Sequence, residues 1–226
     1  MSAIFVAAIG TDCGKTHVSA AILRELTAQG RPALALKPLM SGYSPAALET
    51  SDAGRLLAAL GQPVTAGTVA GICWKSFTEW SAPNVAARNA GVSLKYPLLL
   101  DFVRSRLAAH EGAVLVEGAG GVMSPLTDTH TNIDLMVDLG LPVLLMASNY
   151  LGAVSHMLTA LEALEHRKLK VAAVAVTQSL PNASLAAPLI EELGRWTNHR
   201  IVETGFSRTP DDDRRWAGPL TTLLFG

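Results

Sequence analysis

The chain has 226 residues, of which 49% are hydrophobic and 16% charged, and its formal net charge is −1. This length fits a single α/β domain over residues 1–226, and the balanced charge gives no support for a nucleic-acid partner. Cys13 and Cys73 form no CxxC pair, which argues against a structural disulfide or zinc site. We expect a cytoplasmic protein with no membrane partner, because the apolar N-terminal run lacks a basic flank and every apolar run is too short to span a bilayer.

Five short apolar runs predict strands that are buried on both faces, because none of them alternates cleanly between apolar and polar residues. They lie at residues 3–9, 32–37, 113–118, 142–148 and 171–177. Amphipathic segments of helical length lie between or beside them, at residues 16–30, 98–112 and 155–169. Strands that alternate with helices predict an α/β fold with a doubly wound, mostly parallel sheet flanked by helices. Ligands of such sheets bind at the carboxyl ends of the strands.

The first predicted strand leads into Gly14, Lys15 and Thr16 at the start of a helix. The usual phosphate-binding loop, G-x-x-x-x-G-K-[ST], has its first glycine where this chain has Ile9, and Gly10 comes one residue too late. The strand–loop–helix context still predicts backbone N–H groups that converge on phosphate. Lys15 would reach the β- and γ-phosphates, and Thr16 would bind Mg²⁺. The alternative is a chance helix start with a solvated lysine.

Charged residues stand at or after the ends of the next predicted strands. Lys37 ends the second run and either points into the ligand crevice or snorkels to the surface. Asp52 either faces the site or, like Ser51, is the N-cap of the following helix. Glu117 ends a buried strand before a glycine-rich turn, and burying it unpaired would cost roughly several kcal/mol. Thr16, Asp52 and Glu117 together predict an all-oxygen site for Mg²⁺.

Several segments in one order resemble those of the dethiobiotin synthetases, a family of P-loop NTPases. They are FVAAIGTDCGKT (5–16), LKPLMSG (36–42), SDAGRL (51–56), SAPNVAAR (81–88), VLVEGAGGVMSPL (114–126) and LGAVSHMLTALEAL (151–164). The family loop reads GTDTxVGKT, and an ungapped match places Ala8 on its first glycine. Thr11 and Asp12 then occupy the family's threonine and acidic positions. The loop would therefore have the family's length, with an alanine at its start.

The resemblance implies an enzyme of biotin biosynthesis that uses ATP and Mg²⁺. It would carboxylate 7,8-diaminopelargonate with CO₂ and close the ring to dethiobiotin, through a carbamate and a carbamic–phosphoric anhydride. Lys15, Lys37 and Thr11 would be catalytic, and the metal ligands would be Thr16, Asp52 and Glu117. The resemblance also implies a homodimer with the active site at the interface, where a helix start of the other subunit binds the substrate's carboxylate.

The resemblance assigns further residues to two sides of the site. The ATP and phosphate side comprises Asp12, Cys13, Gly14, Lys15, Thr16, Glu117, Gly118, Gly120 and Thr177. The substrate side comprises Lys37, Ser41, Gly152 and Ser155. Residues 81–87 would lie beside the substrate, or would be an ordinary helix start with Ser81 as cap and Pro83 in the first turn.

Two segments depart from the family pattern. The family often has an asparagine that reads adenine after the fifth strand, where this chain has Thr177 and Gln178. Residues 207–219 read as a charged, proline-containing loop and match the family weakly.

Other residues have simpler readings. Cys13 beside a helix start is either a reactive thiol paired with His17 or a passive filler of the loop. The tryptophans are expected to be packing residues rather than stacking platforms: Trp74, Trp80, Trp196 and Trp216.

Three alternatives to the synthetase remain. A P-loop regulatory ATPase of the partition and site-selection kind would share the fold and a dimer, although such proteins usually carry a second lysine early in the loop, and none precedes Lys15 here. An amidotransferase-type ligase related to the cobyrinate synthetases would need a glutaminase domain, for which this chain has no room. A catalytically altered relative would account for the departures at Ala8 and Thr177.

Overall fold

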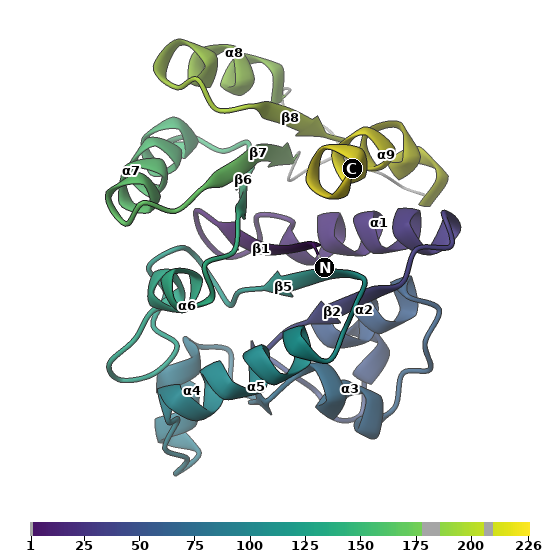
Figure 1. Ribbon diagram of the computed structural model, residues 1–226. Helices are drawn as coiled ribbons and strands as arrows, with labels where there is room; N and C mark the ends of the chain where they lie inside the picture. The colour runs from purple at the N-terminus through teal and green to yellow at the C-terminus, as the bar shows by residue number, and fades with distance from the viewer. Residues whose placement is uncertain (1, 178–185, 206–209) are drawn as a thin grey trace.

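The computed structural model describes residues 2–177, 186–205 and 210–226. Within these residues, six parallel strands form one sheet in the order β2-β5-β1-β6-β7-β8 (Figure 1). The strands are β1 (Ser2–Ala8), β2 (Ala33–Leu36), β5 (Ala113–Glu117), β6 (Val143–Ser148), β7 (Val171–Thr177) and β8 (Ile201–Thr204). The five predicted strands are confirmed, and β8 is an edge strand that the sequence pattern did not reveal.

Helices flank this sheet, so the predicted α/β architecture is confirmed (Figure 1). The three predicted helices are α1 (Lys15–Ala28), α5 (Tyr96–Ala108) and α7 (Ala153–His166). The others are α2 (Asp52–Ala59), α3 (Ala66–Ile72), α4 (Pro83–Asn89), α6 (Asn132–Leu139), α8 (Ala186–Trp196) and α9 (Pro210–Phe225). A 3₁₀ turn, η1 (Leu48–Thr50), precedes α2, and β3 (Leu39–Met40) pairs with β4 (Lys75–Ser76) outside the main sheet.

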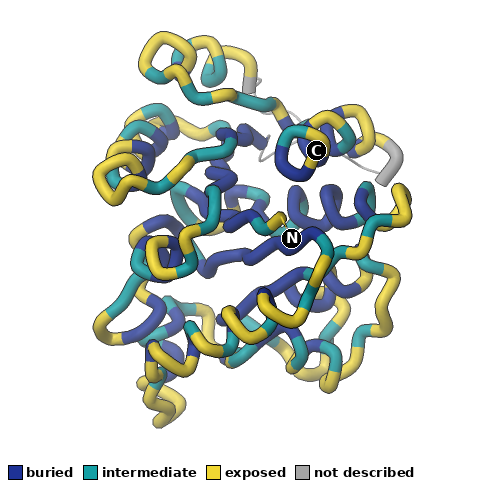
Figure 2. The backbone as a smooth tube through the Cα atoms, viewed as in Figure 1, coloured by how far each residue is buried: buried dark blue, intermediate teal, exposed yellow. Residues whose placement is uncertain are grey.

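The central strands β5 and β6 are buried along their whole length, and β1 is buried from Ile4 onward, as Figure 2 shows by the dark tube through the middle of the molecule. Helices cover the sheet, which explains why these strands are continuous apolar runs rather than alternating ones. Because all six strands are parallel, their carboxyl ends meet at one edge. In this order, β2 lies on one side of β1, with β5 between them, and β6 lies on the other side. The direction in which successive strands are added therefore reverses at β1. The crevice expected for a ligand lies at the carboxyl end of β1 for that reason.

The C-terminal segment corrects the prediction of a charged loop over 207–219. From Pro210 onward the chain is the helix α9, while residues 207–209 lie outside the described residues. Its Asp213 accepts a hydrogen bond from Arg24 of α1 at 2.7 Å, and Trp216 and Leu220 are buried. These two apolar residues, one helical turn apart, are the packing face that the surrounding charges concealed. No helix among the described residues is long and apolar enough to cross a membrane.

We predict that Gly54→Ala destabilises the protein, because a β-carbon at Gly54 in α2 would overlap the carbonyl oxygen of Leu48 in η1. Such overpacking costs about 1–3 kcal/mol in free energy of unfolding, which chemical denaturation measures. Gly71→Ala in α3 is the matched control, since a β-carbon there meets no atom within 4 Å among the described residues. This control is expected to be stabilising by about 0.4–1 kcal/mol. Equal unfolding midpoints for the two variants would contradict the close approach of η1 to α2.

Candidate active site

The segment between β1 and α1 forms a tight loop around the Lys15 side chain. Gly14, at the N-cap of α1, has φ +79° and Asp12 has φ +55°, so the left-handed conformations fall late in the loop. The ammonium of Lys15 donates to the carbonyl oxygen of Gly10 at 3.2 Å, and the residue is only 7% exposed. A solvated lysine at a chance helix start would be exposed, so that alternative is wrong. The conformation instead resembles a loop prepared for an anion at the start of α1.

Thr177 supports this loop from the end of β7. Its hydroxyl lies 3.0 Å from the carbonyl oxygens of both Cys13 and Ala147, and the residue is buried. A β-carbon at Gly14 would come within 3.0 Å of the Thr177 methyl group, so only glycine fits there without a shift. These contacts give Thr177 a supporting position, and its contact with ATP remains a prediction. Gln178, expected beside it, lies outside the described residues.

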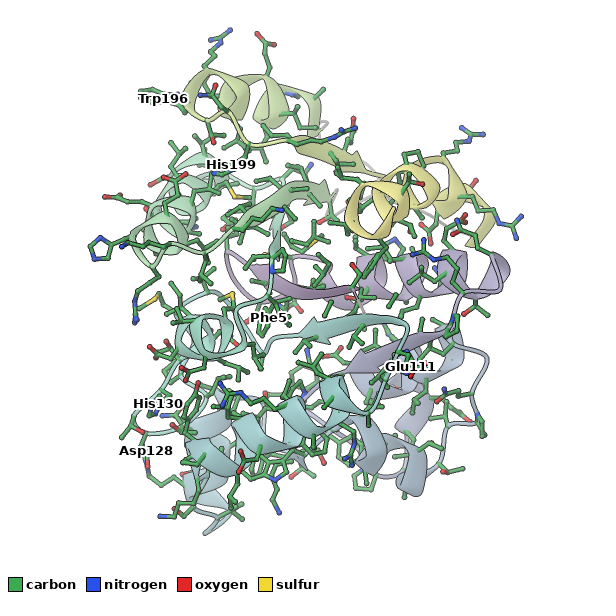
Figure 3. All side chains as sticks on the ribbon, viewed as in Figure 1. Phe5, Glu111, Asp128, His130, Trp196 and His199 are labelled. Atoms are coloured by element: carbon green, nitrogen blue, oxygen red, sulfur yellow. The ribbon has the colours of Figure 1, made fainter. Side chains whose placement is uncertain are left out.

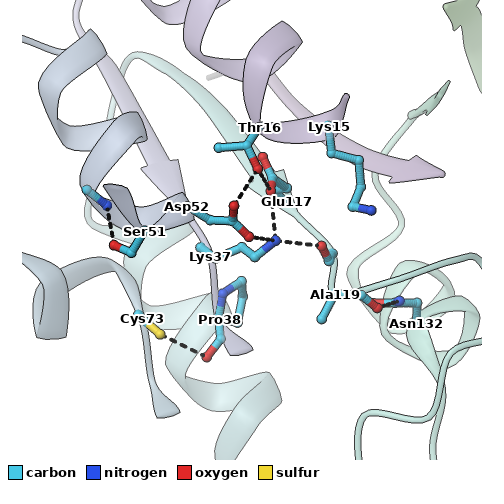
Figure 4. A network of polar contacts seen from close by, with 12 residues as sticks. Lys15, Thr16, Lys37, Pro38, Ser51, Asp52, Cys73, Glu117, Ala119 and Asn132 are labelled. Carbon is cyan, nitrogen blue, oxygen red and sulfur yellow. Dashed lines mark hydrogen bonds and ion pairs between the residues drawn. The ribbon is translucent and has the colours of Figure 1, made fainter. Parts of the chain in front are cut away.

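Lys37 follows β2 and is enclosed by acceptors from two other elements. Its Nζ lies 2.7 Å from Glu117 Oε1, 2.8 Å from Asp52 Oδ2 and 3.1 Å from the carbonyl oxygen of Gly118 (Figure 4). The residue is 3% exposed, so the reading as a snorkelling surface lysine is wrong. The strand end thus delivers a cation to the floor of the predicted crevice.

Thr16 joins the same cluster from the first turn of α1. Its hydroxyl oxygen lies 2.9 Å from Asp52 Oδ1 and 2.7 Å from Glu117 Oε1 (Figure 4). Ser51 is the N-cap of α2, since its Oγ accepts a hydrogen bond from the Gly54 N–H at 3.0 Å. Ser51, and not Asp52, is therefore the helix cap. The Asp52 carboxylate is free of that role and faces Lys37. The three predicted metal ligands are brought together.

The cluster keeps its charges through mutual stabilisation. Burial tends to lower the pKa of Lys37, but Glu117 and Asp52 outweigh it and hold that pKa above its ordinary value. Burial tends to raise the pKa of Asp52, but Lys37 and the hydrogen bonds prevail and hold it below its ordinary value. Burial lowers the pKa of Lys15, and the nearby Lys37 ammonium lowers it further. Two ammonium groups therefore lie close enough to influence each other, an arrangement suited to a polyanionic ligand.

The oxygen atoms of the cluster fit a divalent metal ion. Glu117 is 1% exposed, and its Oε2 has no hydrogen-bond partner among the described residues. A buried carboxylate oxygen without a donor is costly, and a cation would remove that cost. Two carboxylates and a hydroxyl are the hard oxygen ligands that Mg²⁺ prefers. In the part of the chain that the structure describes, no group of three or more His, Cys, Asp or Glu side chains could hold a metal.

A cavity of about 710 Å³ opens above this cluster. It is lined by residues 11–17, 40–43, 50–52 and 80–83, with Lys37, Arg55 and Gly120. The predicted residues Thr11, Asp12, Cys13 and Ser41 thus face the same space as the two lysines. Tyr43 and Arg55 were not predicted; Arg55 stands three residues after Asp52 on α2, and this spacing was the available signal.

The glycine-rich turn after β5 is held in place by Asn132. Its buried Nδ2 donates to the carbonyl oxygens of Ala119 at 2.6 Å and Gly121 at 2.8 Å. A β-carbon at Gly118 would come within 2.9 Å of Asn132 Oδ1, so the turn needs glycine there. In this conformation of the turn, the carbonyl oxygen of Gly118 accepts a hydrogen bond from Lys37. Nothing in the local sequence marks Asn132 for this role, because its partners lie 11 and 13 residues away.

Cys13 has the surroundings of a passive residue. It is 2% exposed, and its thiol points to the carbonyl oxygen of Thr11 at 3.4 Å. His17 Nε2 lies 3.2 Å from Asp213 Oδ1, so its ring is engaged with α9. These contacts favour the reading of Cys13 as a filler of the loop.

The tryptophans do not share one environment. Trp216 is buried, but Trp80 is 86% exposed and Trp196 is 67% exposed, so the expectation of a packing role is wrong for these two. Figure 3 shows Trp196 on α8, far from Phe5 in the core. Ser81 also differs from its alternative reading, because the N-cap of α4 is Ala82, with Pro83 in the first turn.

The start of α7 lies outside the cavity of this chain. Gly152 is the N-cap with φ +96°, and neither it nor Ser155 lines the cavity. The preceding Leu151 is fully exposed, at 102% of its reference area, and Tyr150 is 41% exposed. The predicted contact of Gly152 and Ser155 with substrate therefore requires a second subunit.

Comparisons with known proteins identify the family and the fold. A family model described as an AAA domain matches residues 2–208. The ATP-dependent dethiobiotin synthetase of Caulobacter vibrioides (strain NA1000 / CB15N) is 49% identical over 227 residues, covering 99% of each chain. The enzyme of that name from Phenylobacterium zucineum is 45% identical over 99% of this chain and 95% of its own.

A solved structure extends the likeness to the fold. Cobyrinic acid a,c-diamide synthase from Mycobacterium smegmatis, with bound ATP analog and magnesium, has a TM-score of 0.56 at 14% identity over 98% of this chain and 93% of its own. This likeness shows that the two chains share the fold of the sheet and its helices. The identity to the synthetases over nearly the whole length is decisive for the family: the chain belongs to the ATP-dependent dethiobiotin synthetases.

Proposed function

We propose that the Lys15–Lys37 cavity carries out the reaction of this family, in which 7,8-diaminopelargonate, CO₂ and ATP give dethiobiotin, ADP and phosphate. Family membership supplies the activity, an ATP-dependent ligase reaction of biotin biosynthesis. One observation supports the residue roles above the rest. Lys37 is a buried ammonium between Asp52 and Glu117, at the floor of a cavity that also contains Lys15.

The proposed reaction has three bond-forming steps. One amine of the substrate attacks CO₂ and loses a proton, which forms a carbamate. A carbamate oxygen then attacks the γ-phosphorus of ATP, and the bond to the ADP oxygen breaks. The second amine attacks the carbonyl carbon of the resulting anhydride, phosphate departs, and the ureido ring closes.

The protein contributes position and charge to these steps. Lys15 and the backbone N–H groups of residues 12–14 hold the phosphates, and Lys37 stabilises negative charge on the carbamate and the transferring phosphoryl group. Thr11 and Ser41 line the cavity and would orient the substrate amines. No side chain needs to form a covalent bond with the substrate.

Thr16, Asp52 and Glu117 are the residues that would hold Mg²⁺. When bound there, the ion would neutralise charge on the transferring phosphates. Lys37 contacts one oxygen of each carboxylate and leaves Glu117 Oε2 free of hydrogen bonds from the described residues, which supports this assignment.

We also propose that the functional unit is a homodimer of single-domain chains. The start of α7, with Gly152 and Ser155, would bind the substrate's carboxylate in the cavity of the partner, where the helix dipole favours an anion. The exposed Leu151 and Tyr150 beside this helix start support an interface there.

Lys37→Met is predicted to lower turnover by at least about 100-fold, because charge that develops on the transferring group loses a preorganised donor. ATP binding should change by only a few-fold, since Lys15 and the loop remain. The assay supplies diaminopelargonate, bicarbonate, Mg²⁺ and ATP, and measures dethiobiotin and phosphate. Lys75→Met in β4, an exposed lysine outside the cavity, is the control. Near-normal turnover would refute the role of Lys37, and ATP hydrolysis by the wild type without ureido product would favour a regulatory ATPase.

Glu117→Gln should weaken Mg²⁺ binding by roughly tenfold or more, as loss of metal-site support commonly does. Calorimetry measures the affinity for ATP at increasing Mg²⁺ concentrations, in the absence of diaminopelargonate. The quantity compared is the Mg²⁺ concentration that gives half of the maximal ATP affinity. Glu111→Gln, at an exposed glutamate before β5, provides the comparison. An unchanged Mg²⁺ dependence would remove Glu117 from the metal site.

Leu151→Asp is expected to shift the protein from dimer to monomer, since a charge would be buried at the proposed interface. Sedimentation velocity reports the change, and synthesis of dethiobiotin should fall with dimer content. Leu98→Asp on α5, where an exposed leucine is also replaced, serves as control. If Leu151→Asp stays dimeric and active, the start of α7 is not in the interface.

A further inference from the structure

Trp80 is a large apolar side chain that is exposed inside the candidate site. It lies between β4 and α4, lines the cavity, and leaves 86% of its surface uncovered. The tryptophans elsewhere in the chain do not line this cavity. Leaving an indole in water is unfavourable, so an exposed indole beside reactive groups indicates a surface that a ligand covers.

The position of Trp80 is set by the backbone around Gly42. The N–H of Gly42 donates to the carbonyl oxygen of Glu79 and that of Tyr43 to Phe77, both at 2.9 Å, which ties residues 40–43 to residues 77–79. A β-carbon on Gly42 would lie 2.7 Å from Trp80 Cδ2 and 2.8 Å from Cε2, so the indole ring packs directly against the glycine. Gly42 also has φ +70°, which disfavours any other residue. The ring is therefore placed before a ligand arrives.

The lining of the cavity is chemically mixed. It includes the charged groups Lys15, Lys37 and Asp52. It also includes apolar or aromatic side chains, which are Met40, Tyr43, Trp80, Ala82 and Pro83. Backbone hydrogen bonds join residues 40–43 to residues 77–79, so these residues lie beside the segment that carries Trp80. A ligand that is polar at its reacting end and aliphatic behind it would match this lining.

We propose that Trp80 is a specificity-determining residue whose indole face covers the hydrocarbon chain of the diamino acid substrate. The inference rests on the proposed function, which supplies a substrate with two amines at one end, a methylene chain and a carboxylate. With the amines at Thr11 and Ser41, the methylene chain extends across Trp80. The contact removes apolar surface of both the chain and the indole from water. It persists from ground state to transition state, so it affects substrate binding and not the chemical step.

The test is the kinetics of Trp80→Ala in the dimeric, full-length protein. We expect KM for diaminopelargonate to rise roughly tenfold, equivalent to about 1.4 kcal/mol, with kcat and KM for ATP changed by less than about twofold. Trp80→Phe should recover most of the loss, because a phenyl ring keeps the apolar face. Trp196→Ala removes an exposed indole outside the cavity and should leave all three constants unchanged.

Two further measurements separate a direct contact from an indirect one. Diaminopelargonate should change the tryptophan fluorescence of the wild type, and Trp80→Phe should abolish this change while Trp196→Phe retains it. A diamino acid with a shorter methylene chain should bind the wild type more weakly and show a smaller difference between wild type and Trp80→Ala.

The outcomes are distinguishable. If the wild type makes dethiobiotin and Trp80→Ala keeps the wild-type KM, Trp80 does not contact the chain. If Trp80→Ala instead dissociates the dimer, the indole is an interface residue and the inference is wrong. If the wild type makes no dethiobiotin, the proposed function fails, and the fluorescence titration still reports whether Trp80 contacts the diamino acid.

Discussion

The ammonium of Lys37 between Asp52 and Glu117 is the interaction on which the site depends. Neither Lys37 nor Glu117 could be buried alone without a large desolvation cost, and Asp52, which is partly exposed, joins them from a third part of the chain. Their meeting links the end of β2, the first turn of α2 and the end of β5. The site is therefore complete only when α2 has docked beside the assembled sheet. Glu117 Oε2 has no hydrogen-bond partner among the described residues, so the cluster keeps a carboxylate oxygen that suits a divalent ion.

The phosphate loop shows why an alanine can replace the family's first glycine. Ala8 is the last residue of β1 and fully buried, and it is not among the residues with positive φ. The left-handed conformations occur at Asp12 and Gly14 instead. At Gly14 a β-carbon would crowd the neighbouring Thr177, so glycine is favoured there by space as well as by backbone angle. An alanine is thus compatible with this loop, because its left-handed positions lie later, at Asp12 and Gly14.

The cavity joins two kinds of recognition in one space. Charged groups gather at the strand ends, and the effect of such groups is strongest where water is excluded. The indole of Trp80 and its apolar neighbours offer non-directional contact, which suits an aliphatic chain. The division follows from the fold. Strand ends bring charge to the sheet edge, whereas the loops from β3 to α4 extend the cavity away from it.

The amino-acid sequence by itself determined the parallel strands, the helix after the loop, and the charged residues at strand ends. Apolar runs define where a buried strand stops, and parallel strands stop at one edge, so the pattern alone places Lys15, Lys37 and Glu117 together. For Asp52 the sequence left two readings open, a site residue or a helix cap, and the structure assigns the cap to Ser51.

Only the tertiary structure decided the features that depend on distant contacts. Asn132 holds the turn after β5, Thr177 supports the loop from a strand 164 residues away, and α9 packs on α1 through a face hidden among charges. The exposure of Trp80 is also a feature that depends on distant contacts, because it results from how residues 77–80 pack against Gly42. The local sequence pattern indicates which residues prefer to be buried. Which of them remain uncovered, and what they face, is determined by packing between segments that the sequence keeps apart.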